Sequence, residues 1–442
     1  MRLLKPLRQA ADGSIGAWAD PWINEAITRW FMPLSRAYAA ARMASGSVAR
    51  FRSLLPEADV GPETLMRVAE ADGAYGRAEA IWQEAAFDEA PPSAFARVTA
   101  RRDRAARRLM LTRLHFLPVV ARGRVPPLAW NICDIAAVEA AHGARLADPA
   151  RAFLLPERTP PVQKSAALIR GGLREYWLRS PGPVPGGPSA WARVVEPRRE
   201  TAAMPAIVLL HGIGVEAEMW ADPHGAMTKY LVQQGLRVIR PELPGHGRRC
   251  APGFYGGEEI LACAPIATLD FFRQTALEAA RWIAWAREAG SPRVAIGGVS
   301  LGALASSLVA RVADAWDDGA RPDALFLGSP TGDMVKLVHE SSLTRPIGMP
   351  ERLAAQGWTR EALARWLPLI TPDRPPALAP DRIVAALGDA DELTHFEPGL
   401  RLLRAWGLPD SNLAVMRKGH FTLNFSLTLD TRALDRLVEV LR

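Results

Sequence analysis

The chain has 442 residues, of which 49% are hydrophobic and 23% are charged, and its formal net charge at pH 7 is +7. This length predicts one large domain with an extension, or two domains, and the composition is that of a globular protein rather than a disordered one. The positive charge comes mostly from arginine, and no dense basic run with interleaved aromatic residues is present, so we expect no nucleic-acid partner.

The sequence also bears on compartment and metal content. The stretch at the start, MRLLKPLRQAADGSIGAW, lacks the apolar core of a secretory signal, and no apolar run reaches the length of about 18 residues that spans a bilayer. The three cysteines, Cys133, Cys250 and Cys263, are scattered and form no CxxC pair, which predicts neither a disulfide framework nor a zinc site. We therefore expect a cytoplasmic protein that uses no metal.

Residues 1–165 are predicted to form a helical N-terminal region. Between residues 21 and 42, apolar side chains recur at intervals of three and four residues, which is typical of one helical face. The apolar positions of this helix are Ile23, Ile27, Trp30, Phe31, Leu34 and Tyr38. The face can pack against the rest of the protein or, with its bulky aromatic residues, can rest on a membrane surface as a peripheral contact.

After residue 170 the pattern changes to strands. Residues 173–180 and 190–197 are strand-like runs separated by a Pro- and Gly-rich stretch, which predicts a hairpin or a flexible turn. Six further runs follow at wide intervals, most of them with helical patterns between: AIVLLHG, LRVIRPE, RVAIGGVS, DALFLGSP, RIVAALGD and LAVMRKGH. Strands that are apolar on both faces and alternate with helices predict an α/β fold, with a mostly parallel central sheet covered by helices. Reactive side chains are then expected at the carboxyl ends of the strands.

The run at 294–299 ends in the pattern Gly298-Val299-Ser300-Leu301-Gly302, and a helical pattern follows it. A G-x-S-x-G sequence between a strand and a helix is typical of a sharp turn that exposes the serine hydroxyl, since side chains at Gly298 and Gly302 would collide. The following helix also directs backbone N–H groups and a positive dipole toward the hydroxyl. Ser300 is therefore a candidate nucleophile.

A serine hydroxyl needs a base and a group that orients the base. The run that ends at Gly388 is followed by Asp389 and Asp391, and the last run is followed by His420. Asp333, after the preceding strand, is a further candidate acid. The chain order serine, acid, histidine agrees with one known arrangement of such triads.

With these motifs, residues 170 to 442 resemble the α/β-hydrolase family. The resemblance implies Asp391 as the acid, because the family's acid usually lies three residues beyond the glycine that ends its strand. It further implies a His-Gly loop at His211-Gly212, with the backbone N–H groups of Ile213 and Leu301 as donors to the oxyanion of the transition state.

The same loop allows a different interpretation. Residues 212–217 read G-x-G-x-x-A after a strand, which is the pattern of a dinucleotide-binding turn. Glu242 could then be the acid that binds the ribose, although it lies further along the chain than that pattern requires. This alternative predicts an oxidoreductase and leaves Ser300, the acid and His420 without a role.

Residues 329–380 are predicted to form a cap inserted into the hydrolase domain, which would span residues 166–442. A connection this long is expected to have structure or function of its own. Its apolar side chains either cover the serine or pack the cap against the body: Met334, Leu337, Val338, Leu353, Trp358, Leu363, Trp366, Leu367 and Leu369.

The sequence thus predicts a serine hydrolase of carboxylic esters, with a small-molecule or lipid-like substrate and no cofactor. Ser300 would attack the acyl carbon, His420 would transfer the proton, and Asp391 would orient the histidine. Two alternatives stay open, an acyltransferase or thioesterase that uses the same triad, and a binding protein that has kept the fold. The oligomeric state does not follow from the sequence.

Overall fold

The computed structural model describes residues 16–88, 91–149, 151–156, 160–184, 186–198, 203–216, 225–372 and 374–442. These residues form one mixed sheet with the strand order β1-β3-β4-β6-β5-β7-β8-β9-β10, and β2 pairs with β3. The strands are β1 Gln163–Lys164, β2 Leu168–Arg170, β3 Leu173–Ser180, β4 Ala190–Pro197, β5 Ala206–Leu210, β6 Arg237–Glu242, β7 Val294–Val299, β8 Ala324–Gly328, β9 Ile383–Gly388 and β10 Leu413–Met416.

Strands β5 to β10 are parallel to one another, and β3 and β4 form an antiparallel pair. The predicted hairpin and the mostly parallel sheet are therefore confirmed. All side chains of β5, β7, β8 and β9 are buried, because helices cover both faces of this part of the sheet.

Helices on the two faces enclose two apolar cores. The helices α9 and α18 pack on one face, and α11, α12 and α16 belong to the core on the other. The helices that follow β5 are α9 Gly225–Gln233, η6 Gly247–Arg249, α10 Glu258–Ala262, α11 Ile266–Glu288, α12 Leu301–Val312, η7 Ala313–Ala315, η8 Asp318–Ala320, α13 Met334–Glu340, α14 Met349–Ala354, α15 Arg360–Ala364, η9 Leu367–Leu369, η10 Pro380–Arg382, α16 Phe396–Ala405, η11 Asp410–Asn412, α17 His420–Ser426 and α18 Arg432–Leu441.

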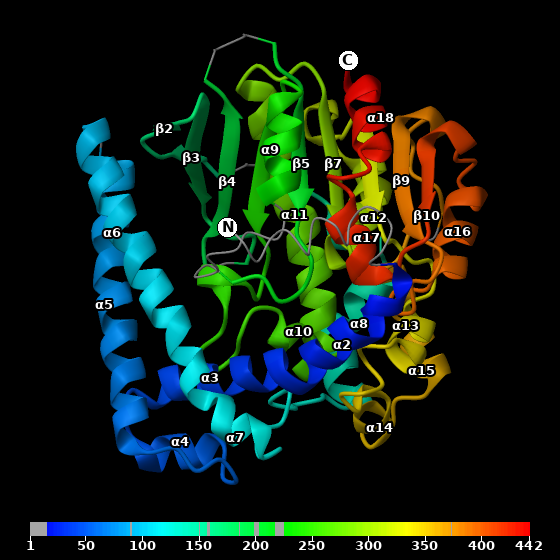
Figure 1. The fold of residues 1–442 in the computed structure, drawn as a ribbon. Helices are drawn as coiled ribbons and strands as arrows, with labels where there is room; N and C mark the ends of the chain where they lie inside the picture. Colours follow the sequence, from blue (N-terminus) through cyan, green and yellow to red (C-terminus); the bar gives the residue numbers. More distant parts are fainter. Residues whose placement is uncertain are drawn as a thin grey trace.

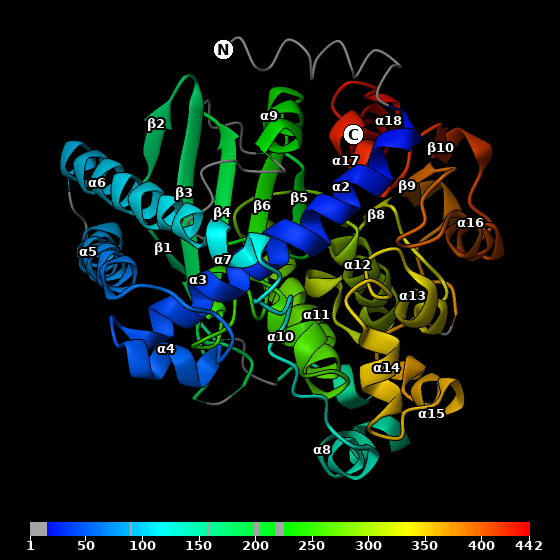
Figure 2. The same ribbon diagram turned by 60° about the horizontal axis from the view of Figure 1, so that its bottom comes forward.

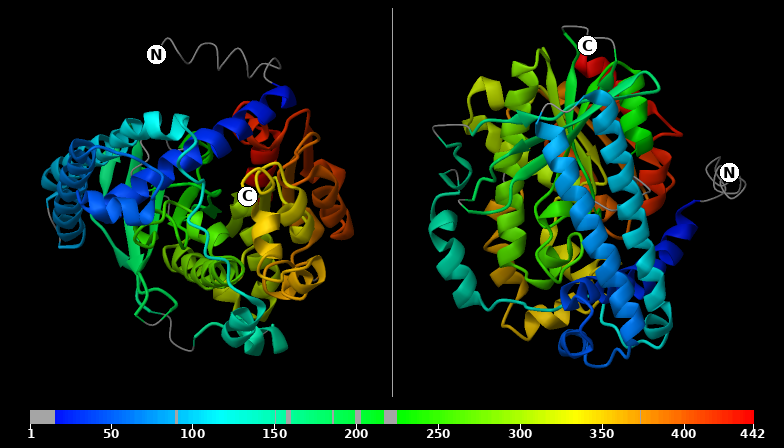
Figure 3. Two further views of the ribbon diagram at one scale, coloured as in Figure 1. Left: turned by 90° about the horizontal axis from the view of Figure 1, so that it is seen from below. Right: turned by 90° about the vertical axis from the view of Figure 1, so that its left-hand side faces the viewer.

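Between residues 17 and 121 the N-terminal region is helical, as predicted. Residues 1–15 lie outside the described residues, and the short strand β1 falls inside the predicted bounds of 1–165. The helices of this region are η2 Ala17–Ala19, α2 Asp20–Ala26, η3 Ile27–Phe31, α3 Met32–Ala44, α4 Val48–Leu54, α5 Pro62–Phe87, α6 Pro92–Leu111, η4 Thr112–Phe116, α7 Leu117–Ala121, α8 Ile135–Ala147 and η5 Arg151–Phe153. Helices α3 to α7 share an apolar core of their own. Trp82 and Phe95, from α5 and α6, also pack against Trp177 and Trp191 on β3 and β4, so this region is fastened to the edge of the sheet (Figure 3).

Residues 17–44, here called the N-terminal strap, run as one long helical segment across the end of the sheet at which the parallel strands finish (Figures 1 and 2). The predicted helix is present, but it contains a π-helical turn at Ile27–Phe31. The strap therefore lies where the reactive side chains are expected.

The predicted cap contains α13, α14 and α15. Its large apolar side chains, among them Leu353, Trp358 and Trp366, belong to the main core, and the indole N–H of Trp358 donates to the Cys133 carbonyl at 2.7 Å. Most of these residues thus pack the cap against the body.

Candidate active site

Ser300 occupies a strained turn between β7 and α12. Its backbone has φ 58° and ψ −124°, a conformation that residues other than glycine rarely adopt. The flanking glycines are required by space: a Cβ at Gly298 would lie 2.5 Å from the Gly302 carbonyl carbon, and a Cβ at Gly302 would collide with the Leu210 carbonyl. The Ser300 N–H donates to the Gly328 carbonyl at 2.9 Å, which ties the turn to the neighbouring strand.

The structure brings Ser300, Asp391 and His420 into one hydrogen-bonded chain. His420 Nε2 lies 2.9 Å from Ser300 Oγ, and His420 Nδ1 lies 2.8 Å from Asp391 Oδ2. With the proton on Nδ1, the imidazole donates to the carboxylate and its Nε2 accepts the serine proton. The imidazole and the carboxylate are both buried, so water does not compete for these bonds.

Neighbouring residues hold the Asp391 carboxylate in its ionised form. Oδ1 accepts the backbone N–H groups of Leu393 and Thr394, each at 2.9 Å, and Oδ2 accepts the Thr394 hydroxyl at 2.8 Å. Burial alone would raise the pKa of Asp391, but the charge of His420 and these hydrogen bonds outweigh it, so the pKa is held well below its ordinary value.

The two other candidate acids lie elsewhere. Asp389 is exposed. Asp333 is the N-cap of α13, where its carboxylate accepts the Lys336 N–H at 2.8 Å. Within the part of the chain that the structure describes, neither residue forms a hydrogen bond or an ion pair with His420.

The predicted oxyanion loop lies against the serine turn. A Cβ at Gly212 would lie 3.7 Å from Ser300 Cβ, and Ile213 lines the cavity beside the serine. Leu301 is the first residue of α12, so its N–H has no acceptor within that helix. His211 fixes the loop, since Nδ1 donates to the Gly212 carbonyl at 2.8 Å and Nε2 accepts the Leu243 N–H at 3.2 Å.

A second anchor of this loop comes from the N-terminal region. The guanidinium of Arg113, on η4, forms a buried ion pair with Glu216, which in turn accepts the Gly256 N–H at 3.3 Å. The same guanidinium lies over the ring of Tyr38, 4.5 Å from its centroid. The N-terminal region thus braces the loop that borders Ser300.

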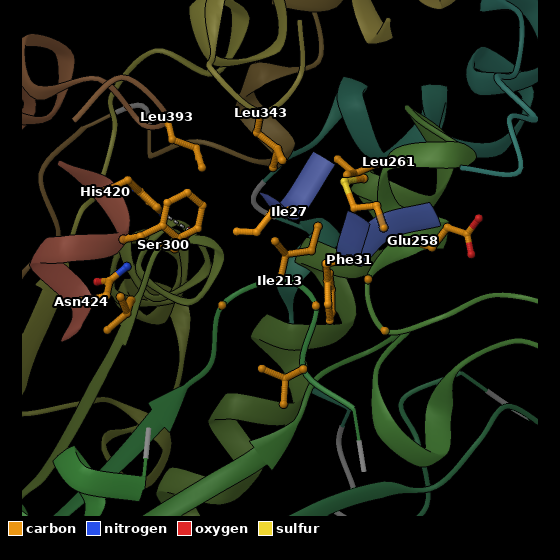
Figure 4. A pocket seen from close by; sticks show the side chains of 18 of the residues that line it. Ile27, Phe31, Ile213, Glu258, Leu261, Ser300, Leu343, Leu393, His420 and Asn424 are labelled. Atoms are coloured by element: carbon orange, nitrogen blue, oxygen red, sulfur yellow. Dashed lines mark hydrogen bonds between the residues drawn. The ribbon is translucent and has the colours of Figure 1, made fainter. Parts of the chain in front are cut away.

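A largely apolar cavity of about 300 Å³ opens beside Ser300. In Figure 4, Ile213, Phe31 and Leu261 lie on one side of it, and Ser300, His420 and Asn424 lie on the other. The apolar wall is formed by Ile27, Phe31, Met32, Ile213, Val215, Leu261, Val299, Leu343, Leu393, Phe421 and Phe425. Of the predicted cap, Leu343 lines the cavity, and three of the wall residues belong to the strap.

The dinucleotide interpretation finds no support. The loop 212–215 faces the cavity at Ser300, and the carboxylate of Glu242 is bound by Arg248. Ala217, the last residue of that pattern, lies outside the described residues.

Three observations bear on other kinds of site. Among the described residues, no three His, Cys, Asp or Glu side chains are grouped so that they could hold a metal ion. Within the described ranges, Cys133, Cys250 and Cys263 form no disulfide. In the part of the chain that the structure covers, no helix combines the length and the apolar character that crossing a membrane requires.

Comparison with known sequences identifies one family. A sequence model described as the alpha/beta hydrolase family matches residues 207–439, which include Ser300, Asp391 and His420 but not the strap. No curated protein sequence matches the chain.

Solved structures with a similar arrangement include two kinds of enzyme. An acetyl xylan esterase from Paenibacillus sp. R4 has a TM-score of 0.47 and 14% identity, over 71% of this chain and 96% of that one. Acetyl xylan esterase 1 from Thermoanaerobacterium sp. JW/SL YS485 has a TM-score of 0.46 and 16% identity, over 67% of this chain and 93% of that one. A prolyl endopeptidase has a TM-score of 0.43 and 17% identity, over 61% of this chain and 39% of that one. Their substrates are properties of those proteins.

Proposed function

Because the chain belongs to the α/β-hydrolase family, we propose that it is a serine hydrolase that cleaves carboxylic esters with a hydrophobic acyl group. The observation that carries the proposal is the hydrogen-bonded chain from Ser300 through His420 to Asp391, with 2.9 and 2.8 Å between its polar atoms. The distance between Ser300 Oγ and His420 Nε2 lies within the range that proton transfer from a serine to a histidine requires.

In the proposed reaction, Ser300 Oγ attacks the acyl carbon while its proton passes to His420 Nε2. The imidazolium is stabilised by the Asp391 carboxylate and then donates the proton to the departing alkoxide, which leaves an acyl-enzyme. A water molecule, deprotonated by the same imidazole, then attacks the acyl carbon. The bond from this carbon to Ser300 Oγ breaks, the imidazolium returns the proton to Oγ, and the acid is released. The N–H groups of Ile213 and Leu301 would stabilise the negative oxygen in both steps, and the loss of one such donor typically costs about 3 to 4 kcal/mol.

The cavity supports the choice of acyl group. Its volume of about 300 Å³ lies at the lower end of the range of small-molecule sites, about 300 to 1,000 Å³. The wall is mostly aliphatic and aromatic, so an alkyl chain would be transferred there from water favourably, at roughly 0.8 kcal/mol for each buried methylene. A medium-length acyl chain fits this wall better than a charged or sugar-like one.

Labelling with a fluorophosphonate probe, followed by mass mapping of the modified peptide, tests the proposal. We expect a label on Ser300 in the wild type and none in Ser300→Ala or His420→Ala. Ser307→Ala is the matched control, because Ser307 lies on the same helix and donates to the Ala303 carbonyl at 2.9 Å, away from His420.

Two results would contradict the proposal. If the folded wild type takes up no label, the protein is a binding protein of this fold rather than a hydrolase. If the label lies on another residue, Ser300 is not the nucleophile. If Ser300 is labelled, product analysis with an added alcohol or thiol distinguishes hydrolysis from acyl transfer.

A further inference from the structure

The helix that begins with His420 lacks an N-cap side chain of its own. α17 comprises His420–Ser426, and its N-cap position is Gly419. The first N–H groups of a helix have no partner within the helix and are usually satisfied by a Ser, Thr, Asp or Asn side chain at the N-cap. The N-terminus of α17 therefore needs an acceptor from elsewhere in the chain.

Asp20, at the start of α2 in the strap, supplies that acceptor. Its Oδ1 accepts the Phe421 N–H at 2.6 Å, and its Oδ2 accepts the Thr422 N–H at 3.4 Å and the Thr422 hydroxyl at 2.5 Å. Asp20 is 9% exposed. A residue 401 positions away in the sequence thus caps the helix.

Gly419 is fitted to this carboxylate. The space that a Cβ at Gly419 would need is filled by the Asp20 side chain, and its three nearest heavy atoms would all belong to Asp20. Asp20 therefore occupies the place where the side chain of an ordinary N-cap residue would lie. Gly419 itself has φ −88° and ψ −165°, which any residue can adopt.

We propose that Asp20 is a positioning residue for His420, through which the N-terminal strap forms part of the catalytic machinery. The inference rests on the proposed function. His420 is the first residue of α17, and its ring must meet Ser300 and Asp391 at 2.9 and 2.8 Å at the same time. A shift of the helix end lengthens both bonds together, because the ring is attached to the residue at which the helix starts.

Asn24, one helical turn after Asp20, provides a matched control. It is 8% exposed, and its side-chain amide donates to the Ser342 carbonyl, so it fastens the strap to the cap segment. Within the described residues, the Asn24 side chain makes no hydrogen bond to α17. The strap also carries Ile27 and Phe31 of the cavity wall. Loosening the strap should therefore raise KM, whereas moving His420 should lower kcat.

The test compares kcat and KM for p-nitrophenyl octanoate in full-length wild type, Asp20→Ala and Asn24→Ala. Misplacing a reacting group by about 1 Å can cost about 100-fold in rate, so we expect kcat of Asp20→Ala to fall by about 10- to 100-fold. Asn24→Ala should change KM and leave kcat close to wild type. If both variants change only KM, Asp20 merely fastens the strap and the inference is wrong.

A second-site substitution separates positioning from loss of folding. In Asp20→Ala, the added change Gly419→Ser places a hydroxyl where the carboxylate was, and serine is among the best N-cap residues. We expect the double variant to recover most of the lost kcat, and Gly419→Ser alone to lose activity because Asp20 fills the space. An unrecovered kcat in a double variant with wild-type thermal stability would overturn the inference. If the wild type neither hydrolyses the ester nor takes up the fluorophosphonate probe, the proposed function is wrong, and the inference about Asp20 is wrong for that reason.

Discussion

The region that the family model matches and the helical region that precedes it build the same cavity by different means. In the matched region, the reacting side chains are held by residues close to them in the chain: Ser300 by the glycines of its turn, and Asp391 by the backbone of Leu393 and Thr394. The preceding region acts over long separations, from Asp20 to α17 and from Arg113 to Glu216.

This difference indicates a division of tasks. Local backbone geometry presents the atoms of the proposed triad, while the N-terminal region caps the His420 helix, braces the predicted oxyanion loop and supplies part of the cavity wall. Substitutions of Ser300, Asp391 or His420 should therefore abolish the proposed chemistry with the fold intact. Substitutions in the N-terminal region should change rate, stability or specificity by smaller amounts.

The largest effect is expected for the acid. Asp391→Ala should lower kcat by about 10⁴-fold, as loss of the aspartate does in other serine hydrolases, because the histidine loses its orientation and its counter-charge. Asp389→Ala and Asp333→Ala are controls, and both should retain activity in the same ester assay. A loss in Asp333→Ala comparable with that of Asp391→Ala would contradict the assignment.

The next effect tests the brace on the oxyanion loop. Arg113→Ala leaves the Glu216 carboxylate buried without its cation, which typically costs about 3 to 5 kcal/mol of unfolding free energy. Arg52→Ala removes an ion pair whose two side chains are 62% and 76% exposed, and should cost less than about 1 kcal/mol. Chemical denaturation measures both unfolding free energies. Equal losses in the two variants would show that the Arg113–Glu216 pair stabilises the fold no more than an exposed ion pair does.

A smaller effect depends on pH and concerns Glu258, which lines the cavity and faces Arg36 of the strap at 3.7 Å. Burial raises the pKa of Glu258 to about 7, although Arg36 and two backbone N–H groups oppose the rise. An unfolded glutamate has a pKa of about 4.3, so between these values the folded protein holds a proton that the unfolded chain releases. The contribution of Glu258 to the unfolding free energy therefore falls as the pH rises through this window.

Glu258→Gln removes this titration. The unfolding free energy of the wild type minus that of Glu258→Gln should fall by on the order of 3 kcal/mol from pH about 4 to about 7.5. This estimate uses about 1.4 kcal/mol for each pKa unit. Denaturation curves at several pH values measure the difference. Parallel stability profiles of the two proteins would refute the prediction.

The smallest effect concerns specificity. Phe31 of the strap lies over the oxyanion loop, since a Cβ at Gly214 would be 3.6 Å from its ring, and it lines the cavity. Phe31→Ala should shift the ratio of kcat/KM toward longer acyl chains by about 10-fold or more, because one methylene group is worth about 1 to 3 kcal/mol in a hydrophobic pocket. Trp22→Ala, whose side chain is 70% exposed, should leave the ratio unchanged. If Phe31→Ala has the same ratio as the wild type, the acyl chain does not bind against Phe31.

Much of the matched region could be predicted from the sequence. Each buried strand is a short apolar run, and the turn at Ser300 is specified by glycines two positions on either side. Asp391 and His420 each follow the end of a strand, where a parallel sheet gathers its reactive side chains. These signals are local, so no knowledge of distant contacts was needed.

The contribution of the N-terminal region could not be predicted in the same way. Nothing in the residues around Asp20 indicates that its partner is a helix at the other end of the chain. The apolar periodicity of residues 23–38 correctly indicated a helix, but not which surface it covers, and the cap was expected to cover the serine as readily as to pack against the body. The division of the chain at residue 165, into a helical N-terminal region and a hydrolase domain, stays a prediction.

The π-helical turn in the strap affects how many of its side chains line the cavity. The Met32 N–H bonds to the Ile27 carbonyl, five residues back, so these two side chains lie on the same side of the helix. In a regular α-helix, with about 100° between successive residues, they would point roughly 140° apart. One surplus residue in the turn lets Ile27, Phe31 and Met32 all border the cavity. This turn therefore decides which side chains of the strap the proposed acyl chain would meet.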